Sequence, residues 1–133
     1  MIVLDTDVLV EFARSNTAST VKSYLSQRAD EQWIVPSIGL YEYLTYYGSQ
    51  SRRRKERRQV EKRVDAVQPL DADAALEASD IENLLRSSGT SLGAGDLLIA
   101  AIARDLGATL ATRNKNDFDK QPIHQLMDID IVR

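Results

Sequence analysis

Cysteine is absent from this chain of 133 residues, and histidine and tryptophan each occur once. The lack of cysteine excludes a disulfide framework, a zinc–thiolate site and a cysteine nucleophile. No apolar run approaches the roughly 20 residues that cross a bilayer, and no basic segment with an apolar core stands at the start as a secretory signal would. We therefore expect a cytoplasmic protein that does not insert into a membrane.

The remaining composition is that of an ordinary globular protein, with 43% hydrophobic and 28% charged residues. The length suits one domain over residues 1–133, which should bury roughly two-thirds of its unfolded surface. The net charge of −3 does not by itself indicate a nucleic-acid binder. Basic residues nevertheless crowd into one stretch that can attract phosphates locally. They are Arg52, Arg53, Arg54, Lys55, Arg57, Arg58, Lys62 and Arg63.

Short apolar runs and helical spacings alternate along the chain. The predicted strands cover residues 2–4, 33–35, 67–70, 108–112 and 129–132, with Pro69 making the third short or peripheral. The predicted helices cover residues 8–14, 17–29, 52–66 and 97–106, with further helices capped by Ser37 and by Asp71 or Asp73. Residues 48–51 should form a turn, and residues 87–95 and 113–121 should form loops.

This alternation predicts an α/β fold with a parallel sheet covered on both faces. Ligands of such sheets bind beyond the carboxyl ends of the strands, near a switch in strand order. Asp5 ends the first strand, which is usually central, and three other acids follow strands or open the helices after them. These are Glu42, Asp96 and Asp117. All four carboxylates should therefore converge at one edge of the sheet.

Each acid taken alone also has a structural explanation. Asp5 and Asp96 suit helix N-caps, Glu42 suits a solvated helix face, and Asp117 suits a loop. The functional prediction depends on the set. Four convergent carboxylates cannot all stay ionised without compensation, which Mg²⁺ or Mn²⁺ can supply. Such an ion can activate water and stabilise charge on a phosphoryl oxygen, so the set predicts phosphodiester hydrolysis.

Asp5-Thr6-Asp7-Val8 after an apolar strand allows a second enzyme class. This run also matches the motif of haloacid-dehalogenase-type phosphatases, with Asp5 as covalent nucleophile and Asp7 as acid or base. No suitable lysine motif follows the second strand, and Asp96 is followed by an apolar helix rather than by a second acid. The phosphatase is therefore the less favoured enzyme.

Four segments in order resemble the motifs of PIN-domain ribonucleases, in particular the VapC-type toxins of prokaryotic toxin–antitoxin pairs. They are Ile2-Val3-Leu4-Asp5-Thr6, Pro36-Ser37-Ile38 with Glu42 and Leu44, Asp96-Leu97-Leu98-Ile99-Ala100-Ala101-Ile102-Ala103, and Thr112-Arg113-Asn114 with Asp117-Phe118. The resemblance spans nearly the whole chain. It implies a three-layer α/β/α sandwich around a five-stranded parallel sheet and endonucleolytic cleavage of RNA.

The resemblance also assigns roles to residues. It implies Mg²⁺ or Mn²⁺ held by Asp5, Glu42, Asp96 and the more variable Asp117, with Thr112 and Asn114 arranging the metal site or the substrate. It further implies a homodimer that is silenced by a cognate antitoxin protein. A non-catalytic PIN-like module that binds RNA or a partner is the alternative from a different class.

Several residues have no settled role at this point. Asp7 either adds a ligand or caps the first helix, and Asp119 is a turn former or a further ligand. Arg52 and Arg53 either contact RNA phosphates or lie on a solvated helix face. The only histidine, His124, is predicted to be structural. Four tyrosines near Glu42 suit base stacking, an interface or the core: Tyr41, Tyr43, Tyr46 and Tyr47.

Overall fold

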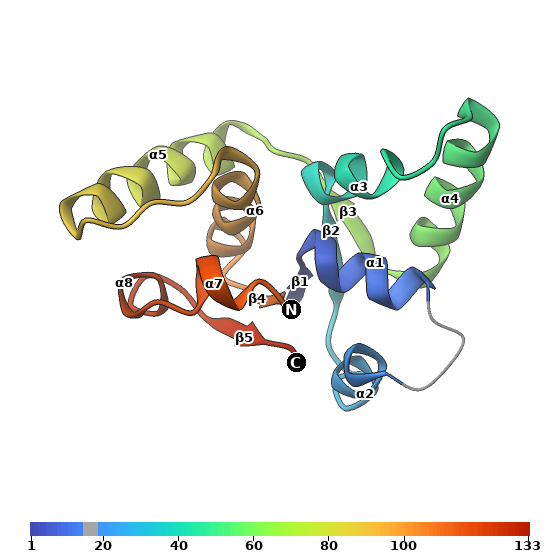
Figure 1. Cartoon of the computed structure of the whole chain (residues 1–133), viewed down its shortest axis with the longest axis horizontal. Coiled ribbons are helices and arrows are strands. Elements are labelled where there is room, and N and C mark those ends of the chain that lie inside the picture. The colour runs from blue at the N-terminus through green and yellow to red at the C-terminus, as the bar shows by residue number, and fades with distance from the viewer. Residues whose placement is uncertain (15–18) are drawn as a thin grey trace.

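One all-parallel, five-stranded sheet forms the centre of the molecule in a computed structural model that describes residues 1–14 and 19–133 (Figure 1). The spatial order is β3-β2-β1-β4-β5, so the first strand is central as predicted. The strand order switches direction between β1 and β4. The strands are β1 (Ile2–Leu4), β2 (Trp33–Pro36), β3 (Ala66–Gln68), β4 (Thr109–Thr112) and β5 (Ile129–Ile131).

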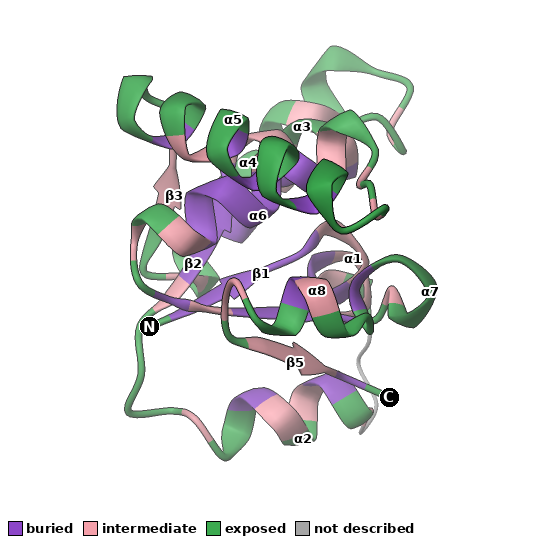
Figure 2. Cartoon of the chain, turned by 90° about the vertical axis from the view of Figure 1, so that its left-hand side faces the viewer, coloured by how far each residue is buried: buried purple, intermediate pink, exposed green. Residues whose placement is uncertain are grey.

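Helices cover both faces of this sheet, so the predicted α/β sandwich is confirmed. Apolar residues of α5, α6, α7 and α8 pack on one face, and those of α1, α2 and α4 pack on the other. The helices are α1 (Thr6–Arg14), α2 (Thr20–Ser26), α3 (Ser37–Leu44), α4 (Gln50–Arg63), α5 (Ala72–Ser87), α6 (Ala94–Asp105), α7 (Lys115–Phe118) and α8 (Gln121–His124). The views in Figures 1 and 2 place α5 beside α6 and α1 below α3.

The register of the sheet explains why its strands are apolar on both faces. Val3 pairs with Leu110 of β4, and both side chains join the core under α5 and α6. Leu4 pairs with Ala111, and both belong to the core under α1 and α4. Because successive side chains of a strand alternate between faces, a fully covered parallel strand must be apolar at every position.

The helix α6 is the most deeply buried of the helices, as its apolar sequence predicts (Figure 2). Gly107 follows its C-cap with a φ of 65°, a left-handed conformation in which glycine has no steric penalty. None of the helices in the described ranges has the length and apolar character needed to cross a membrane.

The starts of the first three helices needed correction, and α6 covers Ala94–Asp105 instead of the predicted 97–106. The first helix begins at Thr6 rather than Val8. The second covers only Thr20–Ser26, capped by the Ser19 side chain, and predicted positions 17 and 18 lie outside the described residues. Ser37 is the first residue of α3 and not its N-cap, because Pro36 has a fixed φ and occupies the cap position.

The polar helix and the third strand are shifted relative to their predicted bounds. The helix α4 starts at Gln50, inside the predicted turn, because the Ser49 side chain accepts the N–H of Arg52. It ends at Arg63, so Ala66 begins β3 instead of ending the helix. This strand lies at the edge of the sheet, as Pro69 indicates, and Asp71 rather than Asp73 caps α5.

The loop predicted at residues 113–121 is wrong, because it contains the short helix α7 and the first residue of α8. Asn114 caps α7 by accepting the N–H of Asp117. The buried side chain of Phe118 anchors this turn to the sheet, and Ile123 anchors α8 in the same core. The last strand covers Ile129–Ile131, which pairs with residues 110–112 of β4, instead of the predicted 129–132.

Candidate carboxylate site

Asp5 lies at the carboxyl end of the central strand and is only 4% exposed. One of its oxygens, Oδ1, accepts the N–H of Thr6 at 2.8 Å, and Oδ2 accepts the Thr112 hydroxyl at 2.7 Å. The pairing of β1 with β4 places Thr112 beside Asp5, and both lie where the strand order switches. The pKa of Asp5 is raised to about 7, chiefly by burial and also by the nearby charges of Asp7 and Asp96, while the hydrogen bonds from Thr112 and Thr6 lower it.

Glu42 approaches the same edge from the second turn of α3. Its Oε1 accepts the Thr6 hydroxyl at 2.6 Å. Its Oε2 faces the first turn of α6, where a Cβ added to Gly95 would lie 3.2 Å from that oxygen. Glycine therefore permits the close approach of Glu42 to the helix that carries Asp96.

Asp96 is the third residue of α6, so it neither caps nor opens the helix as predicted; Gly93 is the N-cap. The position is still near the positive end of the helix dipole, which favours a carboxylate. Burial raises the pKa of Asp96, and so do the charges of Asp117, Glu42 and Asp7, in that order. The acids therefore stand close enough to repel one another.

Asn114 joins the fourth acid to this set. Its amide Nδ2 donates to Asp117 Oδ2 at 2.9 Å and, at 3.5 Å, to Asp96 Oδ2. Its backbone N–H donates to the Thr112 hydroxyl oxygen at 3.0 Å. The hydroxyl of Thr112 and the amide of Asn114 thus form a chain of hydrogen bonds from Asp5 to Asp117.

These side chains surround an open cleft of about 380 Å³. Its lining contains three of the four predicted acids, while Asp117 reaches the cleft only through Asn114. The lining residues are Asp5, Thr6, Asp7, Val10, Glu42, Tyr46, Asp96, Arg113 and Asn114. The cleft is therefore acidic at its floor and carries one basic side chain.

Asp7 lies in the cleft, and Asp119 does not. The Asp7 Oδ1 accepts the N–H of Arg113 at 3.1 Å, and burial raises the pKa of Asp7. Asp119 lies 2.9 Å from the ring Nε2 of His124 instead, at the surface. This contact explains the lone histidine as a structural partner.

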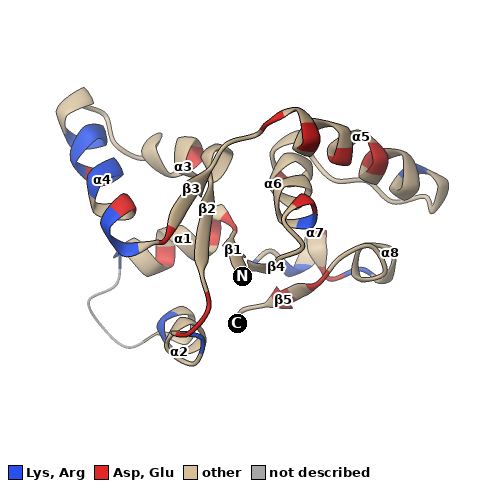
Figure 3. Ribbon diagram, turned by 180° about the vertical axis from the view of Figure 1, so that it is seen from behind, with Lys and Arg blue, Asp and Glu red and all other residues tan. Residues whose placement is uncertain are grey.

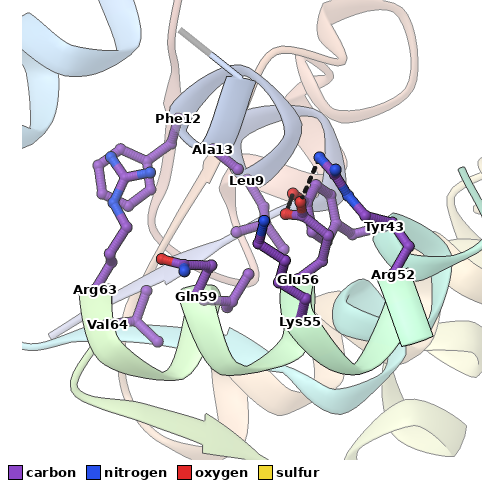
Figure 4. Close-up of a pocket in the computed structure, with 11 residues that line it drawn as sticks. Leu9, Phe12, Ala13, Tyr43, Arg52, Lys55, Glu56, Gln59, Arg63 and Val64 are labelled. Carbon is purple, nitrogen blue, oxygen red and sulfur yellow. Dashed lines mark hydrogen bonds and ion pairs between the residues drawn. The ribbon is translucent and has the colours of Figure 1, made fainter. Parts of the chain in front are cut away.

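Arg52 and Arg53 are not among the residues that line the carboxylate cleft. They lie on α4, whose charge is visible in Figure 3. Arg52 pairs with Glu56 at 2.9 Å, and Arg53 donates to the backbone oxygen of Tyr47 at 2.8 Å. Arg52 lines a separate hollow of about 240 Å³ between α1 and α4, where Figure 4 shows it beside Tyr43 and Glu56. Their proposed contact with RNA stays a prediction.

Two polar residues of the cleft received no role from the sequence, Thr6 and Arg113, and Tyr46 was left open between base stacking, an interface and the core. Thr6 and Arg113 directly adjoin predicted site residues, and Tyr46 lies four positions after Glu42. For Thr6 and Arg113, the signal that the sequence offered was their position just after a predicted strand. The hydrogen bond from Thr6 to Glu42 depends on how α1 meets α3, which no local pattern encodes.

The donor set fits a hard divalent cation. It consists of carboxylate oxygens, the ligands that Mg²⁺ and Mn²⁺ prefer. The pKa values of Asp5 and Asp96 are raised first by burial and then by neighbouring acids, and a bound cation would favour the charged form of both carboxyls. Across residues 1–14 and 19–133, no three acidic or histidine side chains already form a group that could hold a metal ion. In this structure Glu42 and Asp117 accept hydrogen bonds from Thr6 and Asn114.

The family model described as the PIN domain matches residues 2–123. The chain belongs to the PIN-domain family. This membership confirms the resemblance drawn from the four sequence motifs. No curated protein matches the chain.

Solved structures of VapBC proteins share the PIN fold of this chain. DNA-bound VapBC from Salmonella typhimurium gives a TM-score of 0.80 at 21% identity and covers 99% of this chain and 98% of its own. VapBC2 from Rickettsia felis, bound to a promoter DNA fragment, gives 0.78 at 21% identity, with 98% of each chain covered. VapBC-5 from Mycobacterium tuberculosis, described as a member of the VapBC family of toxin–antitoxin systems, gives 0.63 at 22% identity and covers 98% of this chain and 96% of its own.

Proposed function

We propose that this PIN domain is a metal-dependent endoribonuclease that hydrolyses RNA phosphodiester bonds. The observation that carries the proposal is the meeting of Asp5, Glu42 and Asp96 in one cleft at the strand-order switch, with Asp117 attached through Asn114. A cation-dependent site gathers several acids, and these acids repel one another until the cation binds. The family membership supports the same chemistry.

Asp5, Glu42, Asp96 and Asp117 are the residues that would hold Mg²⁺ or Mn²⁺. When bound, the ion would activate water as the nucleophile and stabilise charge on the phosphoryl oxygens. The hydroxyl of Thr112 donates to one oxygen of Asp5 and so fixes the orientation of that carboxylate at the cleft. Asn114 holds Asp96 and Asp117 through one amide group. These hydrogen bonds would reduce the reorganisation needed when substrate and cation enter.

Arg113 supplies the basic side chain that lines the cleft. Its guanidinium lies 3.5 Å from Glu11 and is 39% exposed, so part of its hydrogen-bonding capacity faces solvent. An arginine in this position can bind a phosphate of the RNA while the acids hold the cation. The described part of the cleft lining contains no lysine, which a haloacid-dehalogenase-type phosphatase would be expected to place there.

We propose a toxin of a toxin–antitoxin module as the biological setting, in the cytoplasm and as a homodimer. The support is the fold similarity to VapBC structures, one of them described as a toxin–antitoxin system. A cognate antitoxin would then be the protein partner. Co-purification of the chain with the product of an adjacent small gene would test this part separately from catalysis.

Cleavage of end-labelled total RNA tests the enzymatic proposal. The purified chain should give discrete fragments with Mg²⁺ or Mn²⁺ and none with EDTA. Asp96→Asn keeps the size of the side chain and removes its charge, so it should lower the cleavage rate about a thousand-fold, as expected for losing several kcal/mol of metal-assisted stabilisation. Asp119→Asn, outside the cleft, is the matched control and should cleave like the parent chain. Equal cleavage by all three proteins would contradict the proposal, and metal binding without any cleavage would favour the binding module.

A further inference from the structure

Four tyrosines on α3 and the turn after it have two different environments. Tyr43 is 3% exposed, its hydroxyl donates to Glu56 at 2.8 Å, and it lies 3.1 Å from the Tyr47 hydroxyl. The Tyr43 and Tyr47 rings meet edge to face at 5.6 Å. These two tyrosines attach α4 to α3. They are therefore accounted for by the fold.

Tyr41 and Tyr46 are each 68% exposed. Within the described ranges, neither side chain has a hydrogen-bond partner or a ring contact. Packing therefore does not explain either residue. An exposed aromatic ring keeps a large apolar face in water, and such faces are used in recognition of ligands.

Only one of these two rings belongs to the carboxylate cleft. Tyr46 lines it, together with Val10 and Arg113. Tyr41 lines a different hollow, beside Leu40 and Arg53. Tyr46 follows Glu42 by four residues and lies in the turn after α3, where its backbone N–H donates to the oxygen of Tyr43. Both Tyr46 and Glu42 line the cleft.

The cleft lining thus combines the apolar side chains of Tyr46 and Val10 with several acids and the guanidinium of Arg113. A single-stranded RNA nucleotide presents the matching chemistry, since a flat apolar base lies next to a charged phosphate. We infer that Tyr46 is a base-binding residue, whose ring stacks on an unpaired nucleobase next to the phosphate that the acids cleave. This inference rests on the proposed ribonuclease function. The stacking contact of Tyr46 should itself depend little on base identity, because every base has a face for stacking.

Fluorescence of 2-aminopurine, which stacking on an aromatic ring quenches, tests this assignment. The probes are single-stranded oligo(A), oligo(C) and oligo(U) ribonucleotides, each with one 2-aminopurine, mixed with excess full-length chain and Mn²⁺. Single-turnover cleavage at increasing protein concentration separates the half-saturating concentration from the maximal rate. Tyr46→Ala should abolish the quenching and raise the half-saturating concentration about ten-fold. Tyr46→Trp should retain both, because it keeps an aromatic face.

Tyr41→Ala is the matched control, since Tyr41 is equally exposed and lies outside the cleft. It should behave like the parent chain. Unchanged quenching in Tyr46→Ala, or equal losses in both alanine variants, would overturn the assignment of Tyr46 and leave the ribonuclease proposal standing.

Asp96→Asn should keep the quenching and lose cleavage. Cleavage that survives in Asp96→Asn while Tyr46→Ala loses quenching would overturn the catalytic proposal instead. A parent chain that neither quenches nor cleaves any probe would overturn both.

Discussion

The helices α6 and α4 have similar lengths, 12 and 14 residues, and opposite means of attachment. Half of α6 is buried in the core under the sheet. In α4 only Val60 is buried. Its other attachments include polar contacts of Glu56 and Arg53 with α3 and the turn after it, and the Arg63 guanidinium lies 4.1 Å from the centre of the Phe12 ring in α1. Figure 2 shows α6 as largely buried, and Figure 3 shows most of the α4 ribbon in the colour of Lys and Arg.

The contrast between α6 and α4 indicates which parts of the molecule can hold like-charged side chains close together. Apolar burial is strong and non-directional, so α6 can carry Asp96 toward Asp5 and Glu42 despite their repulsion. Polar surface contacts are individually weak, so α4 can gather basic residues only where solvent screens them. The carboxylate cleft depends on the first kind of attachment, and the basic face of α4 on the second.

The largest expected effect is on the pH dependence of the free energy of unfolding, because the fold holds the Asp5 carboxyl buried beside other acids. In the metal-free chain, the pKa of Asp5 is raised from 3.8 to about 7, chiefly by burial. A carboxyl whose folded pKa exceeds its unfolded pKa stabilises the fold fully below the unfolded value, and this stabilisation is lost as pH rises through the folded value. At about 1.4 kcal/mol per pKa unit, the loss is at most about 4 kcal/mol.

Urea unfolding in EDTA, compared between the parent chain and Asp5→Asn, measures this effect. The asparagine does not titrate, so its stability relative to the parent should increase from about pH 5 to about pH 8. A constant difference over that range would show that the fold does not strain this carboxylate. Adding Mn²⁺ should reduce the difference, because only the parent has the Asp5 charge for the ion to neutralise.

The next effect compares the two helices directly. Ile99→Ala in α6 should lower the free energy of unfolding by about 2–5 kcal/mol, since Ile99 is fully buried. Val60→Ala in α4 removes two methyl groups and should cost about 1–2 kcal/mol. Denaturant midpoints at unchanged slope provide the measurement. Ile99→Val, expected at about 0.5–1.5 kcal/mol, is the control for the size of the cavity. Equal costs for the two alanine variants would refute the contrast between α6 and α4.

A smaller effect is expected for the polar attachment of α4. Tyr43→Phe keeps the ring but removes the hydroxyl that donates to Glu56 and adjoins Tyr47. The cost should be about 1.5 kcal/mol, the lower end of the range for a hydrogen bond to a charged group. Amide hydrogen exchange should rise in α4 and stay unchanged in α6. Uniform acceleration over both helices would mean that α4 does not open independently.

The smallest effect is expected on the outer face of α4. Arg57 and Glu61 form an ion pair of 3.1 Å, but the two side chains are 63% and 45% exposed. Glu61→Gln should therefore change the free energy of unfolding by less than about 0.5 kcal/mol, measured by the same urea titration at low salt. A change above about 1 kcal/mol would show that the charges on this helix are coupled in a network.

The sequence was sufficient to predict the fold class, the central first strand and the buried α6. Each depends on a pattern that is complete within its own segment, such as the apolar run after Asp96. The short helices α7 and α8 were missed because their stability comes from Phe118 and Ile123, whose burial depends on distant parts of the chain. The start of α3 was shifted by one residue for a local reason, the backbone of Pro36.

The candidate site was predictable only in part. The convergence of acids follows from strand ends in a parallel sheet, and the structure brings Asp5, Glu42 and Asp96 into one cleft. Their action as metal ligands stays a prediction. Thr6 and Tyr46 could not be assigned from the sequence, because one requires the hydrogen bond from α1 to α3 and the other requires knowing which tyrosines pack.

The hydrogen bond from Thr112 to Asp5 joins residues 107 positions apart and has a consequence for biosynthesis. The ribosome makes the central strand β1 first, yet this strand must wait for β4 to arrive before the cleft can form. Contacts so distant in sequence form late in folding. On the proposed ribonuclease function, we therefore expect a nascent chain not to cleave RNA during most of its synthesis, and a product terminated before Thr112 to be inactive.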